Sequence, residues 1–205
     1  MKQAIVAVAA LVAGLAWTGG AGAQTLVGQP APQFSVVDTA GKTVSLSDFK
    51  GKYVVLEWTN PDCPFVQKHY NSGNMQATQK HAGTKGVVWL SVNTTGGKEG
   101  DPKLAAELAS WAKTQKSAAT TVLLDSGKLG HAYGARTTPH MYLIDPTGKT
   151  VYAGAIDSKA SANPGDIASA TNYVVQAIDE TAAGKPVSKP VTAAYGCSVK
   201  YASAG

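Results

Sequence analysis

The stretch YVVLEWTNPDCPFVQKHY, residues 53–70, is the most informative part of the sequence for the fold, because it predicts a strand, a short loop and then a helix. The run 53–58 is mainly apolar, as is typical of a strand covered on both faces of a sheet. Pro64 suits the first helical turn, where its missing N–H has no partner to lose. Cys63 therefore stands at a helix start, where unpaired N–H groups and the helix dipole favour a thiolate. The stretch predicts a potentially nucleophilic sulfur.

The first 23 residues have the pattern of a secretory signal peptide. Lys2 supplies a positive charge, residues 5–17 are apolar, and Ala-Gly-Ala at 21–23 is a cleavage site of small residues. The apolar run is too short to be a good transmembrane span, and no later stretch is apolar enough to cross a bilayer. We therefore expect a periplasmic or secreted protein that begins at Gln24 and has no stable membrane insertion. An uncleaved membrane anchor is the less favoured alternative.

The composition argues against nucleic-acid binding. The chain has 18 Lys and Arg residues against 13 Asp and Glu residues, which gives a formal net charge of +5. The lysines are scattered, Arg136 is the only arginine, and no cluster of basic and aromatic residues occurs. A mildly cationic, solvated surface explains this balance. The length of the mature chain suits one domain with its own core.

Export changes the interpretation of the two cysteines, Cys63 and Cys197. In an oxidising compartment they can form a disulfide across 134 residues (197 − 63 = 134), worth roughly 5 kcal/mol in the chain-entropy model. A purely structural bridge is therefore one hypothesis. The position of Cys63 at an electropositive helix start favours a reactive thiol instead.

Strand and helix patterns alternate along the mature chain. Apolar runs and turn signals predict strands at residues 33–37, 43–46, 52–58, 87–93, 121–124, 138–145 and 150–154. Periodicity and helix-start signals predict helices at residues 64–82 with an interruption near 71–74, from 101 onward, and at 166–183. We predict three segments: a signal peptide (1–23), one α/β domain (24–183) and a C-terminal tail (184–205) that carries Cys197.

This order of elements resembles the thioredoxin fold, and four motifs narrow the resemblance to redoxins of the alkyl hydroperoxide reductase/thiol-specific antioxidant superfamily. The motifs are GQPAPQF (28–34), VSLSDFKGK (44–52), Cys63-Pro64 and Thr138-Pro139. The resemblance implies a thioredoxin-like α/β fold, with a central mixed β-sheet flanked by helices, an N-terminal β-hairpin and a C-terminal tail. It also implies that Pro139 is a cis-proline beside the active sulfur, with Thr138 presenting backbone groups to a bound thiol or peptide.

Two departures from the family patterns shape the expected chemistry. The sequence Cys63-Pro-Phe-Val66 lacks the second cysteine of a Cys-x-x-Cys redox motif. Thr59 lies four residues before Cys63, whereas peroxiredoxins place this threonine three residues before, and Pro139 stands where peroxiredoxins carry an arginine. We therefore expect the distant Cys197 to resolve intermediates that form on Cys63.

These features predict an exported thiol-dependent oxidoreductase that reduces peroxides or exchanges thiols and disulfides. Cys63 is the expected nucleophile and Cys197 the resolving cysteine, and the neighbouring Tyr195 and Tyr201 favour a tail that docks on the domain. Such an enzyme needs no bound cofactor, but it needs an external thiol electron donor and a peroxide or disulfide substrate. Peroxiredoxin-like folds often pair, so a homodimer is possible.

Two acidic residues lie close to the expected nucleophile. Glu57 stands in an apolar strand, where it could be a buried carboxylate that relays protons with a raised pKa. Strand alternation could equally turn Glu57 to solvent or to a lysine. The buried and the outward-facing interpretations both stay open. Asp62 precedes Cys63 and is expected to cap the following helix.

Two other functions are open. A non-catalytic, partner-binding redoxin would keep a Cys63–Cys197 bridge as a structural link that resists reduction. A copper-handling protein is less favoured, because thioredoxin-fold copper chaperones carry C-x-x-x-C-P. This chain keeps only Cys63-Pro64 of that motif, with Thr59 at the position of the first cysteine. The spacing therefore supplies no metal motif, and no metal site is predicted.

Overall fold

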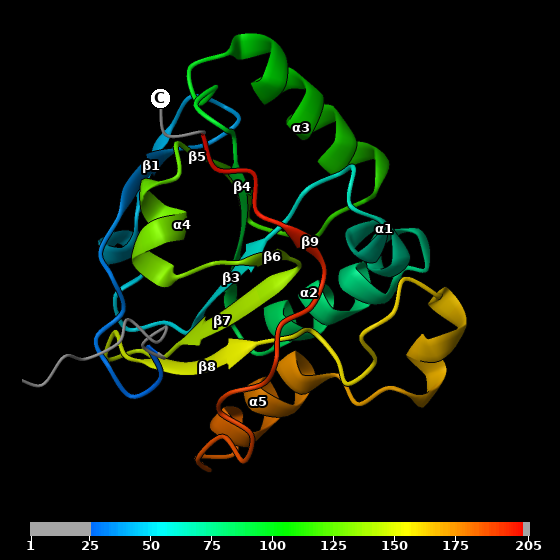
Figure 1. Cartoon of the computed structure of the whole chain (residues 1–205). Coiled ribbons are helices and arrows are strands. Elements are labelled where there is room, and N and C mark those ends of the chain that lie inside the picture. The colour runs from blue at the N-terminus through cyan, green and yellow to red at the C-terminus, as the bar shows by residue number, and fades with distance from the viewer. Residues whose placement is uncertain (1–25, 203–205) are drawn as a thin grey trace, which may run out of the picture.

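The computed structural model describes residues 26–202, and its centre is a mixed sheet of five strands (Figure 1). The strand order is β5-β4-β3-β7-β8. The strands are β3 (Val54–Trp58), β4 (Val88–Thr94), β5 (Thr121–Asp125), β7 (His140–Ile144) and β8 (Thr150–Gly154). β3, β4 and β5 run parallel, whereas β7 is antiparallel to both β3 and β8. The predicted thioredoxin-like fold with a central mixed sheet is confirmed.

The central strand β3 is buried along its whole length and supplies side chains to two cores. Because strand side chains alternate, Leu56 and Trp58 enter one core and Val55 enters the other. The first core is covered by the hairpin of β1 (Ser35–Val37) and β2 (Thr43–Ser45), the 3₁₀ turn η1 (Leu46–Phe49) and the helix α4 (Lys128–Tyr133). Each fully buried large apolar side chain stabilises the fold by about 1.5–3 kcal/mol.

The second core lies under three helices, and this is the face that positions the sulfur. The helices are α1 (Pro64–Asn71), α2 (Asn74–Thr84) and α5 (Tyr173–Ala182), while α3 (Pro102–Thr114) packs beside β5 (Figure 1). The predicted interruption of the first helix is confirmed. Gly73 separates α1 from α2, with the left-handed φ of +77° that glycine adopts without steric cost.

Two helix predictions differ from the structure. The segment predicted as one helix over 166–183 is a 3₁₀ turn, η2 (Pro164–Ser169), followed by a break and then α5. The break arises because the Asn172 side chain accepts hydrogen bonds from the N–H groups of Val174 and Val175 and so begins a new helix there. The short helix α4 was not predicted, since six residues carry little periodic signal.

The chain after α5 runs back across the domain, passes the start of α1 and continues toward α4 (Figure 1). Thr192 N–H donates to Ala153 O, which places the tail along the edge strand β8. Further on, β9 (Cys197–Ser198) pairs antiparallel with β6 (Thr137–Thr138). The predicted tail therefore docks on the domain within the described residues. The predicted signal peptide lies outside them.

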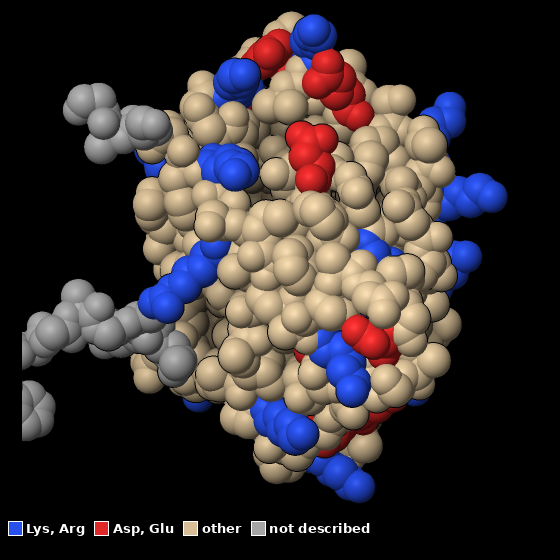
Figure 2. Space-filling view, turned by 45° about the vertical axis from the view of Figure 1, so that its right-hand side comes forward, with Lys and Arg blue, Asp and Glu red and all other residues tan. Residues whose placement is uncertain are grey.

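Charged side chains are dispersed over the face shown in Figure 2, with wide uncharged areas between them. Such a face offers no continuous basic surface to a phosphate backbone. Among residues 26–202, no helix is long and apolar enough to cross a membrane.

Candidate functional site

Cys63 is the N-cap residue of α1, and its side chain is 1% exposed. Pro64 follows at the first helical position, as the sequence predicts. The Cys63 thiol Sγ lies 3.0 Å from Thr138 O and donates a hydrogen bond to it. The expectation that Asp62 caps the helix is wrong, because the cap position belongs to Cys63. The Asp62 backbone N–H instead donates to the Asn60 side chain, which closes the preceding turn.

The Thr138–Pro139 peptide bond is cis. The Thr138 carbonyl faces the Cys63 sulfur at the point where β6 ends and β7 begins. On its other side, Thr138 is the pairing partner of Cys197 in the β6–β9 ladder. One residue of a cis-proline loop therefore contacts both of the cysteines that the sequence singles out.

Cys197 lies against Cys63, and both are free thiols. The approach of the tail requires the glycine before it. Gly196 has a φ of +140°, and a Cβ placed there would lie 2.0 Å from Thr138 O. Any larger residue would therefore force β9 away from β6, and with it the Cys197 sulfur away from Cys63.

The two thiols differ in acidity. Burial raises the pKa of Cys63, but hydrogen bonds from Cys197, the Thr138 side chain and the Val66 N–H outweigh it and leave the pKa below its ordinary value. Burial raises the pKa of Cys197 to about 11, and the neighbouring Cys63 adds to this. The pKa of Cys63 is therefore the lower of the two, so Cys63 loses its proton more readily than Cys197 does.

Glu57 is fully buried and turned toward the second core, so the solvent-facing alternative is excluded. Four side chains donate to its carboxylate: Tyr70 (3.0 and 3.1 Å), Gln79 (3.3 Å), Trp89 (2.7 Å) and Ser91 (3.0 Å). Burial raises the pKa of Glu57 to about 7, and these hydrogen bonds limit the rise. Glu57 is therefore a carboxyl group that titrates near neutral pH inside the domain, and its hydrogen bonds go to core side chains rather than to the cysteines.

Thr59 is buried just after β3, and its side chain makes no hydrogen bond to either sulfur within the described residues. Its Oγ1 has no hydrogen-bond partner within the described residues, while its backbone carbonyl accepts from the Asn93 side chain. Residues 26–202 contain no group of three or more His, Cys, Asp or Glu side chains arranged for a metal ion. The structure thus joins Cys63, Cys197, Thr138 and Pro139, whereas the hydrogen bonds of Glu57 and Thr59 go to other residues.

A second polar group, between α1 and the tail, was not foreseen from the sequence. Asp157 comes shortly after β8 and meets Lys68 and His69 of α1 and Tyr195 of the tail. The only sequence signal is indirect, since Lys68 and His69 lie together on a helix that must bury one face. No local pattern links either of them to Asp157.

Comparison with known proteins places this geometry in a family. A family model described as AhpC/TSA family matches residues 27–153, more than half of the chain. The chain is 32% identical over 124 residues to the thiol-disulfide oxidoreductase ResA of Bacillus subtilis, a match that covers 60% of this chain and 64% of ResA. A shorter match, 58% identical over 43 residues, covers 20% of this chain and 22% of Peroxiredoxin-2 of Bos taurus. The chain thus spans less than two thirds of either curated relative.

The fold has a solved counterpart over most of its length. The crystal structure of an uncharacterized conserved protein from Geobacillus kaustophilus matches with a TM-score of 0.73 at 23% identity. The match covers 89% of this chain and 96% of that chain. It extends the likeness well beyond the residues that the family model matches.

Proposed function

Because the chain belongs to the AhpC/TSA family, we propose that it is an exported thiol-dependent oxidoreductase with Cys63 as nucleophile and Cys197 as resolving cysteine. The observation that carries the proposal is the contact of two free thiols at the start of α1, one with a lowered pKa and one with a raised pKa. Two cysteines that form a structural disulfide do not require different pKa values. A nucleophilic cysteine and its resolving cysteine do, because the first must be deprotonated before the second.

The reaction favoured by this pair is thiol–disulfide exchange. The Cys63 thiolate attacks one sulfur of a substrate disulfide, forms a mixed disulfide and expels the first substrate thiolate. Cys197 then loses its proton, attacks the Cys63 sulfur, closes the Cys63–Cys197 bond and expels the second thiolate. An external dithiol donor reduces this bridge and is itself oxidised to a disulfide. No bound cofactor is needed.

The acidity difference also orders the two steps. While Cys63 is a thiolate, its charge and hydrogen bond raise the pKa of Cys197 and keep it protonated. Once Cys63 has formed a covalent bond to substrate, that negative charge is gone. The Cys197 thiol is then more readily deprotonated, so the resolving thiolate forms when the mixed disulfide is present to receive it.

Peroxide reduction is a second candidate, because Cys63 is almost completely covered and a small oxidant reaches it more easily than a folded protein does. The local similarity to Peroxiredoxin-2 supports this candidate. In that reaction the Cys63 thiolate takes one oxygen from the peroxide, becoming a sulfenic acid as the other oxygen leaves as an alcohol or water. Cys197 condenses with the sulfenic acid, releasing water and forming the same bridge.

The test uses the protein without residues 1–23, dithiothreitol as donor, and either glutathione disulfide or hydrogen peroxide as oxidant. Wild type should turn over at least one oxidant, and Cys63→Ser should abolish turnover. Cys197→Ser should react once and accumulate the Cys63 mixed disulfide or sulfenic acid, as seen by mass spectrometry. Turnover in Cys63→Ser, or a Cys63–Cys197 bridge that resists millimolar dithiothreitol, would contradict the proposal. The resistant bridge would instead favour the partner-binding alternative.

A further inference from the structure

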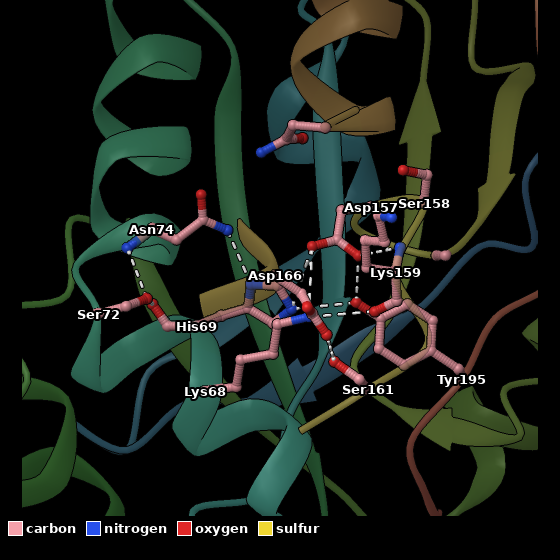
Figure 3. Close-up of polar contacts among 12 residues, drawn as sticks. Lys68, His69, Ser72, Asn74, Asp157, Ser158, Lys159, Ser161, Asp166 and Tyr195 are labelled. Atoms are coloured by element: carbon pink, nitrogen blue, oxygen red, sulfur yellow. Dashed lines mark hydrogen bonds and ion pairs between the residues drawn. The ribbon is translucent and has the colours of Figure 1, made fainter. Parts of the chain in front are cut away.

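Four side chains form a polar group between α1 and the tail, which we call the anchor cluster: the buried Lys68, His69 and Asp157 and the partly buried Tyr195 (Figure 3). The first two come from α1, Asp157 follows β8, and Tyr195 comes from the tail. The side chains of Lys68 and His69 are fully buried, and that of Asp157 is 2% exposed. Buried charges of this kind persist only where they have partners.

Asp157 Oδ2 faces the Lys68 ammonium at ion-pair distance, and Asp157 Oδ1 accepts the hydrogen bonds. Lys68 Nζ lies 3.6 Å from Asp157 Oδ2 and donates a hydrogen bond to Lys159 O at 3.1 Å. The Tyr195 hydroxyl donates to Asp157 Oδ1, and Lys68 Nζ lies 5.6 Å from the centre of the Tyr195 ring. The Lys159 N–H also donates to Asp157 Oδ1, at 2.9 Å, so Tyr195 is the tail's contribution to a carboxylate that is otherwise held by residues of the domain.

His69 fixes the direction of the Tyr195 hydrogen bond. The Asn74 side-chain amide donates to His69 Nδ1 at 2.7 Å, so the ring proton belongs on Nε2. His69 Nε2–H then donates to the Tyr195 hydroxyl at 3.2 Å, leaving the hydroxyl proton for Asp157. The hydroxyl is thus bound from two sides, and the chain of donors runs in one direction from Asn74 to Asp157.

The same tyrosine packs on the residue beside the nucleophile. The rings of Tyr195 and Phe65 meet edge to face with their centres 5.8 Å apart. Phe65 follows Cys63 by two residues, and Tyr195 precedes Cys197 by two residues. Because so short a segment has little freedom, the placement of Tyr195 relative to α1 limits where the Cys197 sulfur can lie.

We propose that Tyr195 is a positioning residue for the resolving thiol, and that the anchor cluster binds its hydroxyl so that Cys197 is held against Cys63. This rests on the proposed function, because it assigns to Tyr195 the presentation of Cys197. Holding two reacting groups in place raises their effective concentration, and with it the rate of the intramolecular step alone. The intermolecular attack by Cys63 does not gain from it.

The reduced protein, reacted with 5,5′-dithiobis(2-nitrobenzoate), separates the two steps. The Cys63 thiolate displaces one thionitrobenzoate and forms a mixed disulfide, at a rate proportional to the reagent concentration. The Cys197 thiolate then attacks the Cys63 sulfur and displaces the second thionitrobenzoate, at a rate independent of reagent. Cys197→Ser should release only the first equivalent, which identifies the site of the first attack.

Tyr195→Phe removes the hydroxyl and keeps the ring that packs on Phe65. We expect the reagent-independent release to slow about tenfold, as for the loss of a hydrogen bond to a charged group. The first release should be equal or faster, because a looser tail exposes Cys63. Tyr173→Phe is the matched control, since the Tyr173 hydroxyl makes no hydrogen bond within residues 26–202, and both releases should keep their wild-type rates.

Two results would overturn the positioning role while leaving the proposed function intact. One is a second release in Tyr195→Phe as fast as in wild type. The other is a slowing of both releases by the same factor, which is what a general loss of structure produces. A wild-type protein that gives a first release but no reagent-independent second release would overturn the resolving role of Cys197 and the positioning role together.

Discussion

Glu57 is the residue whose environment is most unusual for its type. Its carboxyl group lies in the central strand with no exposed surface, and hydrogen bonds from four side chains offset the cost of burying it. Its pKa of about 7 lies above the ordinary 4.5, so the folded protein holds a proton there that the unfolded chain releases. Stability from this group is fully present below pH 4.5 and is lost as the pH rises through 7.

Glu57→Gln should therefore remove a pH dependence. The free energy of unfolding of wild type, relative to the variant, should fall by about 3 kcal/mol between pH 4.5 and pH 8. Burial lowers the pKa values of His69 and His140 to about 4 in both proteins, so their opposite contribution cancels in the difference. Urea unfolding across this range measures it. A difference that stays constant with pH would show that Glu57 titrates normally.

Among the secondary-structure elements, the short ladder between β6 and β9 has a specific consequence, because it holds the tail against the cis-proline loop. It has two residues on each strand, yet it joins the cis-proline loop to the tail that carries Cys197. Gly196 permits this approach because a side chain there has no room beside Thr138 O. The ladder and the anchor cluster thus hold the two ends of the same short segment.

Gly196→Ala should separate β9 from β6 and disrupt formation of the Cys63–Cys197 bridge. After one equivalent of hydrogen peroxide, quenched samples analysed by mass spectrometry should show the bridge forming at least tenfold more slowly than in wild type. Gly184→Ala is the control, because Gly184 also has a positive φ but no atom within 4 Å of its added Cβ. It should cost about 1 kcal/mol of stability and leave bridging unchanged. Equal rates of bridge formation in the two variants would contradict the role of the β6–β9 ladder in holding Cys197 near Cys63.

At the level of the whole molecule, the docked tail brings Cys197 to the start of α1. The cysteines that meet there are 134 residues apart (197 − 63 = 134), so their bridge would enclose most of the domain. Closing such a loop removes freedom mainly from the unfolded chain. The reduced fold already brings the two sulfurs together, so little native rearrangement opposes the bond.

Oxidation should therefore raise the melting temperature. The chain-entropy model gives roughly 5 kcal/mol, which corresponds to a rise of about 10 °C or more for a domain of this size. The lowered pKa of Cys63 favours its thiolate, which stabilises the reduced form and makes the expected rise in melting temperature smaller. Calorimetry on oxidised and dithiothreitol-reduced protein measures the shift, with Cys197→Ser as a control that should show none. Equal melting temperatures, with the bridge verified by mass spectrometry, would contradict a docked tail in the reduced state.

Local patterns predicted much of the fold correctly. The strand that ends near Trp58, the proline that starts α1 and the break at Gly73 are each fixed by residues within a few positions of one another. The missed break before α5 is local as well, because the Asn172 cap could have been recognised from its side chain. The six residues of α4 were too few to show a period.

Local sequence patterns were enough to predict that a cysteine begins a helix after a buried strand, because capping and burial act between neighbours along the chain. That Glu57 faces inward, that Cys197 reaches Cys63 and that Asp157 binds Tyr195 follows from the three-dimensional arrangement alone. Each of these depends on which distant segments share a face of the sheet. Strand order and the path of the tail set those contacts, and no local pattern encodes them.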